Sequence, residues 1–267
     1  MTRRPNPWQQ SSKFLIYLQR QTRAVLEMLC PEICLLCGTE LSTRPRVFGA
    51  PVCRSCFLEL DRASVNECIG CGAPVAPDIE LCLSCNNQRE LQQPNELGHI
   101  HSLLVYRNTA ARLISSWKIG SRRALTPLLV VMLGEFLRTR LHTIGYTSLG
   151  EIPIVPVPAR PASRIRRGWN PPGSLVRGLE RQYGARALHA LRRNNKGRQQ
   201  KSLGREHRLA NISGAFELRS GQLQELPPTV ILFDDVLTTG ATAAECVRVL
   251  QNHGVSKVIT VVVARDL

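Results

Sequence analysis

Val230-Ile-Leu-Phe-Asp-Asp-Val-Leu-Thr-Thr-Gly-Ala-Thr242 is an apolar run that leads into two carboxylates and a turn rich in threonine. Four apolar residues without Gly or Pro predict a buried parallel strand. The following residues have helical apolar spacing up to His253, and Gly254 is placed to end that helix in a left-handed conformation. Strand, polar loop and helix in this order predict an open α/β sheet, in which ligands bind beyond the carboxyl ends of the strands.

The loop after this strand suits a phosphate. Residues 238–242 offer backbone N–H groups and hydroxyls at a helix N-terminus. Asp234 and Asp235 would repel a phosphate in the same cradle, so we expect them to face sugar hydroxyls or a magnesium ion. A phosphorylated ribose meets both requirements. The alternative is a structural turn with an N-cap threonine, but adjacent carboxylates at a strand end are costly without a ligand or a metal.

The stretch resembles the signature of type I phosphoribosyltransferases, which bind 5-phosphoribosyl 1-diphosphate (PRPP). The resemblance implies that Asp234 and Asp235 are catalytic and contact the ribose hydroxyls, with magnesium bound alongside PRPP. The loop that would wrap the 5′-phosphate comprises Val236, Thr238, Thr239, Gly240, Ala241 and Thr242.

Charge is concentrated in one part of the chain. The 267 residues contain 35 Lys and Arg against 20 Asp and Glu, a formal charge of +15. Residues 160–208 contain fourteen of these cations and only two acids, a net +12. The positive field is therefore local, which predicts a polyanionic partner.

Nine of the ten cysteines lie between Cys30 and Cys85. Clustering of this kind without a secretory signal favours zinc in a reducing cytoplasm over disulfides. Four Cys-x-x-Cys pairs supply eight thiolates, enough for two structural zinc ions. The ligands predicted are Cys34, Cys37, Cys53, Cys56, Cys68, Cys71, Cys82 and Cys85. Pairing of successive motifs is the simplest arrangement, and a cross-braced pairing stays open; Cys30 and Cys246 are interpreted as packing residues.

Changes in composition and a polar linker divide the chain into three predicted parts. Residues 1–29 predict an amphipathic helix. Its apolar run, residues 14–18, is too short and too interrupted by polar and charged residues for a signal peptide or a membrane span. Residues 30–95 form the predicted double zinc ribbon, with a polar linker over 86–98. Residues 96–267 form the predicted α/β domain.

Periodicity predicts further elements inside that α/β domain. A short strand is expected over 102–106, and helices over 110–119 and 125–141, with Pro127 in a first turn. Residues 152–158 are expected to be extended and to leave the sheet at its carboxyl end. Near the end of the first helix, the pair Trp117-Lys118 is placed to reach the site, although core packing is the favoured interpretation for Trp117.

Ordered landmarks in the second half of the chain resemble the ComF branch of the phosphoribosyltransferase fold. They are Val155-Pro-Val-Pro158, Arg160, Arg167-Gly-Trp-Asn170, Gln200-Lys-Ser-Leu203, Arg208-Leu-Ala-Asn211 and Ala215-Phe216. The resemblance implies a type I phosphoribosyltransferase-like, mainly parallel sheet flanked by helices and preceded by zinc ribbons. It also implies a pyrophosphate loop with Arg160, Arg164 and Arg167, and a hood over 194–205 that brings Lys196, Arg198 or Lys201 to the ligand. Pro171 replaces the glutamine common in the family, which weakens any base-contacting role for this loop.

Two functional classes follow. In the first, the protein is a phosphoribosyltransferase that transfers ribose phosphate to an unidentified acceptor in nucleotide metabolism. In the second, which the ComF resemblance implies, it is a cytoplasmic protein that binds PRPP and takes part in DNA uptake during natural transformation. Single-stranded DNA and uptake proteins such as a helicase would be its partners. The nucleic-acid contacts predicted are Arg166, Arg167, Trp169, Arg192, Arg193, Lys196 and Arg198, with Trp117 and Trp169 as stacking surfaces.

Overall fold

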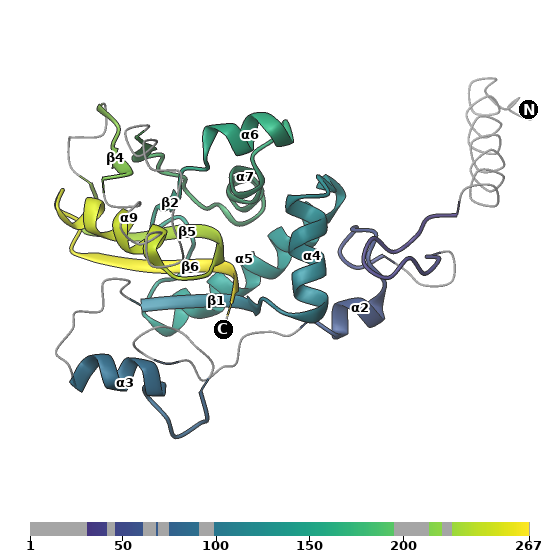
Figure 1. Ribbon diagram of the computed structural model, residues 1–267, viewed down its shortest axis with the longest axis horizontal. Helices are drawn as coiled ribbons and strands as arrows, with labels where there is room; N and C mark the ends of the chain where they lie inside the picture. The colour runs from purple at the N-terminus through teal and green to yellow at the C-terminus, as the bar shows by residue number, and fades with distance from the viewer. Residues whose placement is uncertain are drawn as a thin grey trace, which may run out of the picture.

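The computed structural model describes residues 31–41, 46–60, 68, 75–90, 99–194, 214–220 and 226–266 (Figure 1). The helices and strands of this part of the chain are, in order, α2 (Arg54–Leu58), α3 (Leu83–Glu90), β1 (His99–Val105), α4 (Asn108–Lys118), η1 (Arg123–Leu125), α5 (Thr126–Thr143), β2 (Ile154–Pro156), α6 (Pro161–Arg167), α7 (Pro171–Tyr183), β3 (Leu191–Arg193), β4 (Phe216–Leu218), β5 (Thr229–Leu237), α9 (Ala241–Gln251) and β6 (Lys257–Arg265).

A four-stranded sheet lies at the centre of the molecule, in the order β1-β6-β5-β2. All three neighbouring pairs are parallel. β5 is the strand predicted from the apolar run before Asp234, and β6 beside it is buried along almost its whole length. Parallel strands need helical crossovers that cover the sheet, so both faces of these strands are apolar.

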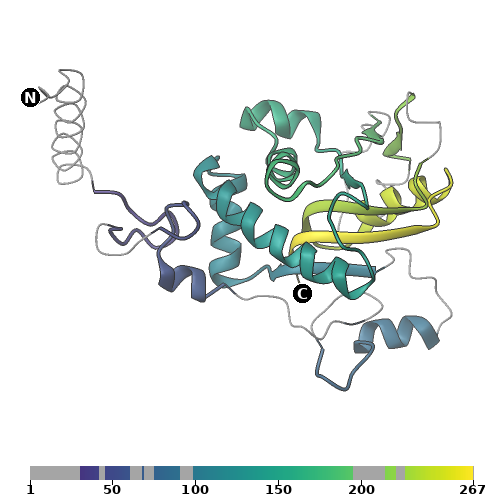
Figure 2. The ribbon, with the colours of Figure 1, turned by 180° about the vertical axis from the view of Figure 1, so that it is seen from behind.

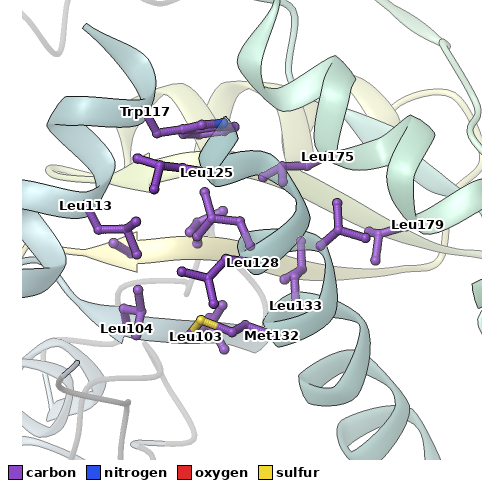
Figure 3. Packing of buried hydrophobic residues seen from close by; sticks show 14 of the residues in the cluster. Leu103, Leu104, Leu113, Trp117, Leu125, Leu128, Met132, Leu133, Leu175 and Leu179 are labelled. Atoms are coloured by element: carbon purple, nitrogen blue, oxygen red, sulfur yellow. The ribbon is translucent and has the colours of Figure 1, made fainter. Parts of the chain in front are cut away.

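Side chains of β5 alternate between two separate cores. Ile231 and Phe233 belong to one core, which α4, α5 and α7 cover. Figure 3 shows how leucines of α5 and α7 pack below Trp117 in this core. Val230 and Leu232 belong to the other core, which is covered by α9 and by the antiparallel hairpin β3–β4. Figure 2 shows the sheet between these layers from behind.

The first cysteine segment packs directly against the α/β domain. Cys34, Val52 and Cys56 lie in the same core as residues of α4 and α5. Thr109 Oγ1 at the start of α4 donates to Glu59 Oε2 over 2.9 Å. This segment therefore shares a hydrophobic core with the sheet.

The predicted α/β class is confirmed, with a parallel sheet flanked by helices and cysteine clusters before it. Pro127 lies in the first turn of α5, and Gly254 has the positive φ (+96°) of a left-handed residue after α9. α3 extends to Glu90, into the segment predicted as a linker. The predicted helix in residues 1–29 lies outside the described residues. In the described part of the chain, no helix is long and apolar enough to cross a membrane.

Candidate functional site

A cleft opens where β2 ends beside β5, which continues to Leu237. The two strands are in register at Pro156 and Phe233, and the Val157 N–H donates to the Phe233 carbonyl over 2.8 Å. Beyond this point lies a cavity of about 330 Å³, a size typical of small-molecule sites. Its lining residues are Lys118, Val157, Pro158, Ala159, Arg160, Ser163, Arg167, Pro172, Arg193, Asp234, Asp235 and Thr242.

The two carboxylates of β5 both line this cavity, in different surroundings. Asp235 is nearly buried and forms an ion pair with Lys118 of α4, with 2.6 Å between Nζ and Oδ1. Asp234 Oδ1 accepts the backbone N–H of Asp235 over 2.8 Å. Burial, followed by the charge of Asp235, raises the pKa of Asp234 to about 7. Among the described residues, Asp235 has an ion-pair partner, and Asp234 is influenced by the charges of Lys118 and Arg193 without such a pair.

Three arginines face the same cavity from other elements. Arg160 precedes α6, Arg167 ends it, and Arg193 comes from β3. Burial, and then the nearby Arg160 guanidinium, lower the pKa of Arg193. Two guanidinium groups held close together repel each other, and an anion bound between them relieves this repulsion. The cleft thus has an acidic edge and a basic edge.

The N-terminus of α9 forms the third side. Gly240 precedes the helix with φ at +77°, a left-handed conformation that suits glycine. No side chain caps this helix end, so its first N–H groups are available to an anion. Thr238 and Thr239 are exposed in the loop, and Thr242 lines the cavity. This arrangement can hold a phosphate.

The structure thus brings together Asp234, Asp235, Thr242, Arg160 and Arg167 among the residues predicted for PRPP. Lys201 and the hood from residue 195 onward lie outside the described residues, as does the side chain of Arg164. The prediction omitted Ser163 and Pro172 because it placed no helix at α6 or α7. The Arg160-Pro161 and Asn170-Pro171 pairs were the available signals, since proline favours the first turn of a helix.

The residues predicted to contact nucleic acid are divided by the structure. Arg166 is exposed on α6, and Arg193 faces the cavity. Arg192 points away from it, with its Nε 3.1 Å from Glu217 Oε1 on β4. Lys196 and Arg198 lie outside the described residues.

Trp117 and Trp169 are not available as stacking surfaces. Trp117 is fully buried, and Trp169 is only 8% exposed. Their rings pack edge to face at 5.7 Å, and the Arg123 guanidinium lies 5.5 Å from the centre of the Trp169 ring. The expectation that these aromatics stack on bases is therefore corrected: they join α4 to the loop before α7.

The first cysteine cluster contains Cys34, Cys37, Cys53 and Cys56, whose sulfur atoms all lie within 4.8 Å of one another. The backbone N–H groups of Leu36 and Cys53 point at Cys34 Sγ, at 3.5 and 3.4 Å. Hydrogen bonding with Thr39 lowers the pKa of Cys37 to about 6. Such N–H groups stabilise thiolates, and four thiolates fit a closed tetrahedral zinc site.

The second cluster contains Cys68, Cys82 and Cys85, with the Cys82 N–H 3.2 Å from Cys68 Sγ. The remaining predicted ligand, Cys71, lies outside the described residues. Successive motifs therefore pair with each other, which decides between the two pairings left open by the sequence. Cys246 is separate from both clusters; it is buried on α9, and burial raises the pKa of its thiol, as expected for a packing residue.

Known proteins resemble this chain over most of its length. It is 29% identical over 233 residues to the DNA utilization protein YhgH of Salmonella typhimurium, which is 85% of this chain and 94% of that protein. It is 28% identical over 234 residues to the DNA utilization protein YhgH of Escherichia coli K12, with the same coverage. No protein-family model matches the chain.

Proposed function

We propose that this chain, a homologue of the YhgH proteins and similar in its landmarks to the ComF family, binds PRPP in its cleft and acts in DNA utilization. Single-stranded DNA would be held on a basic rim, the exposed arginines around Arg166 of α6. One observation carries the PRPP part of the proposal. The cavity at the strand ends combines an acidic pair, three arginines and an open helix N-terminus.

Each part of PRPP has a chemical counterpart in the cleft. The N–H groups at the start of α9 suit the 5′-phosphate. Asp234 and Asp235 accept hydrogen bonds from the ribose hydroxyls, while Arg160, Arg167 and Arg193 face the diphosphate. Carboxylate oxygens are also the ligands that magnesium prefers, and the bound ion would supply further positive charge against the diphosphate.

The direct test is isothermal titration of PRPP with magnesium into the zinc-loaded protein. Wild type should bind, and Arg160→Met should bind about tenfold more weakly, because a hydrogen bond to a charged group contributes about 1.5–3 kcal/mol. Arg166→Met is the matched control, since Arg166 is exposed on the same helix segment and does not line the cavity. No heat of binding with wild type would refute the proposal.

The DNA part of the proposal rests on the homology and on the charge of the rim. Residues 160–208 carry a net +12, more than one small ligand requires, and Arg166 remains exposed beside the cleft. Phosphate contacts of such arginines are independent of sequence and strongly dependent on salt. Since the tryptophans are buried, the rim would act through charge.

Fluorescence anisotropy with a labelled oligothymidine measures this binding against salt concentration. The logarithm of the affinity should fall linearly with the logarithm of salt, with a slope of roughly 0.7 per phosphate contacted. Arg166→Gln should reduce the slope by about one such contact. Arg138→Gln, on the exposed side of α5, should leave it unchanged. Absence of binding at low salt would exclude single-stranded DNA as a ligand.

A further inference from the structure

In the described part of the chain, Lys118 is the cation that forms an ion pair with the acidic pair, although it lies 117 residues before Asp235 in the sequence. Its Nζ lies 2.6 Å from Asp235 Oδ1, and the side chains of Lys118 and Asp235 are 24% and 9% exposed. Because the contact is short and both charges are largely buried, the ammonium group of Lys118 neutralises the carboxylate of Asp235.

The backbone of Lys118 is held firmly. It is the last residue of α4, directly after the fully buried Trp117. Trp117 Nε1 donates to Thr126 Oγ1 over 3.1 Å, and its ring packs against Trp169. Figure 3 shows Trp117 above the leucines of the core. The backbone of Lys118 is therefore fixed, whereas its flexible side chain can move away from Asp235.

The other cations of the cleft are placed differently. In the described part of the chain, Arg160 and Arg167 form no ion pair, so their charge is available to an anion. Asp235, by contrast, already has a counter-ion in Lys118. A divalent cation that arrives alone must displace an ammonium group from Asp235 and leave that charge beside three arginines. An anionic ligand that arrives with the cation gives Lys118 a new partner.

We propose that Lys118 is the built-in counter-ion of Asp235 and that the cleft takes up a divalent cation only together with an anionic ligand. The proposal rests on the PRPP site in naming that ligand, but the competition between Lys118 and a metal ion at Asp235 can be measured without PRPP. Divalent metal ions bound through one or two carboxylates usually rely on ligand phosphates for the rest of their affinity.

The test measures binding of Mn²⁺ alone by electron paramagnetic resonance, on protein whose cysteine clusters carry zinc. Zinc holds thiolate sites against Mn²⁺, so the signal reports oxygen ligands. Lys118→Met should bind Mn²⁺ at least about tenfold more tightly than wild type, because it removes a positive charge next to Asp235. Lys118→Arg keeps the charge and should keep the weak binding. Adding pyrophosphate should raise the Mn²⁺ affinity of wild type more than that of Lys118→Met.

Two further variants test whether the gain in Mn²⁺ affinity arises at Asp235. Lys257→Met removes the same lysine charge at the exposed start of β6, outside the cavity, and should leave Mn²⁺ binding as in wild type. Lys118→Met combined with Asp235→Asn should lose the gain. Circular dichroism establishes that each variant is folded. Equal Mn²⁺ affinity in folded Lys118→Met and wild type would overturn the inference even if PRPP binds. A gain in Lys118→Met would uphold it even if PRPP does not bind.

Discussion

Replacing Asp234 and Asp235 together by asparagine is expected to weaken the binding of PRPP with magnesium by about 100-fold, since each charged hydrogen bond contributes about 1.5–3 kcal/mol. Both carboxylates line the cavity at the end of β5, where the ribose would lie between the arginines and the start of α9. Asparagine keeps the volume and one acceptor oxygen of each side chain but removes the charge. Isothermal titration of the double variant against wild type measures the loss.

The same titration can be repeated at different pH values to test the role of Asp234. Because burial and Asp235 raise the pKa of Asp234 to about 7, its ionised form accumulates only above neutral pH. A ligand that needs the carboxylate should therefore bind wild type about tenfold more weakly at pH 6 than at pH 8. Asp234→Asn alone should lose most of this dependence, apart from titration of PRPP itself.

A double control removes two carboxylates elsewhere. Glu135→Gln combined with Glu217→Gln changes the net charge equally, and neither residue lines the cavity. This variant should bind PRPP as wild type does. Equal affinity in the aspartate variant and wild type would remove the acidic pair from the ligand site.

The sheet could be predicted from one strand, because a strand buried on both faces has apolar residues at every position of its sequence. Val230 to Phe233 is apolar at every position, and the structure assigns alternate residues to two different cores. The ComF resemblance is confirmed by the YhgH homology, although it depended on the order of individually weak landmarks. β6 was not predicted, even though residues 258–264 are apolar except for Thr260.

Local chemistry predicted one side of the site, and the family resemblance predicted Arg160 and Arg167 on another. Asp234 to Thr242 lie on one strand, loop and helix, so their proximity follows from chain connectivity. Arg193 comes from β3, and only tertiary packing brings it to the cavity; Lys118 of α4 was predicted to be able to reach the site, but its ion pair with Asp235 was not predicted. Burial is equally non-local. Trp169 follows a cluster of arginines in the sequence, which suggested an exposed aromatic, yet its ring packs against Trp117, more than fifty residues earlier.

Cys56→Ser is expected to remove about one zinc ion per chain and to lower the melting temperature by about 10 °C or more. Cys56 is a buried member of the four-cysteine cluster, and serine leaves only three thiolates there. A structural zinc site contributes on the order of 10 kcal/mol to folding. In a domain of this size, each lost kcal/mol lowers the melting temperature by roughly 2–4 °C.

The effect should extend beyond the cysteine segment because its core is continuous with that of α4 and α5. We therefore expect one cooperative transition at lower temperature in calorimetry, with metal content measured by mass spectrometry on reduced protein. Cys246→Ser is the matched control: it changes a buried cysteine of α9 outside both clusters and should leave about two zinc ions bound. Full zinc content in Cys56→Ser would show that these thiols do not hold the metal. An unchanged melting temperature after zinc loss would show that the cluster and the sheet do not share their stability.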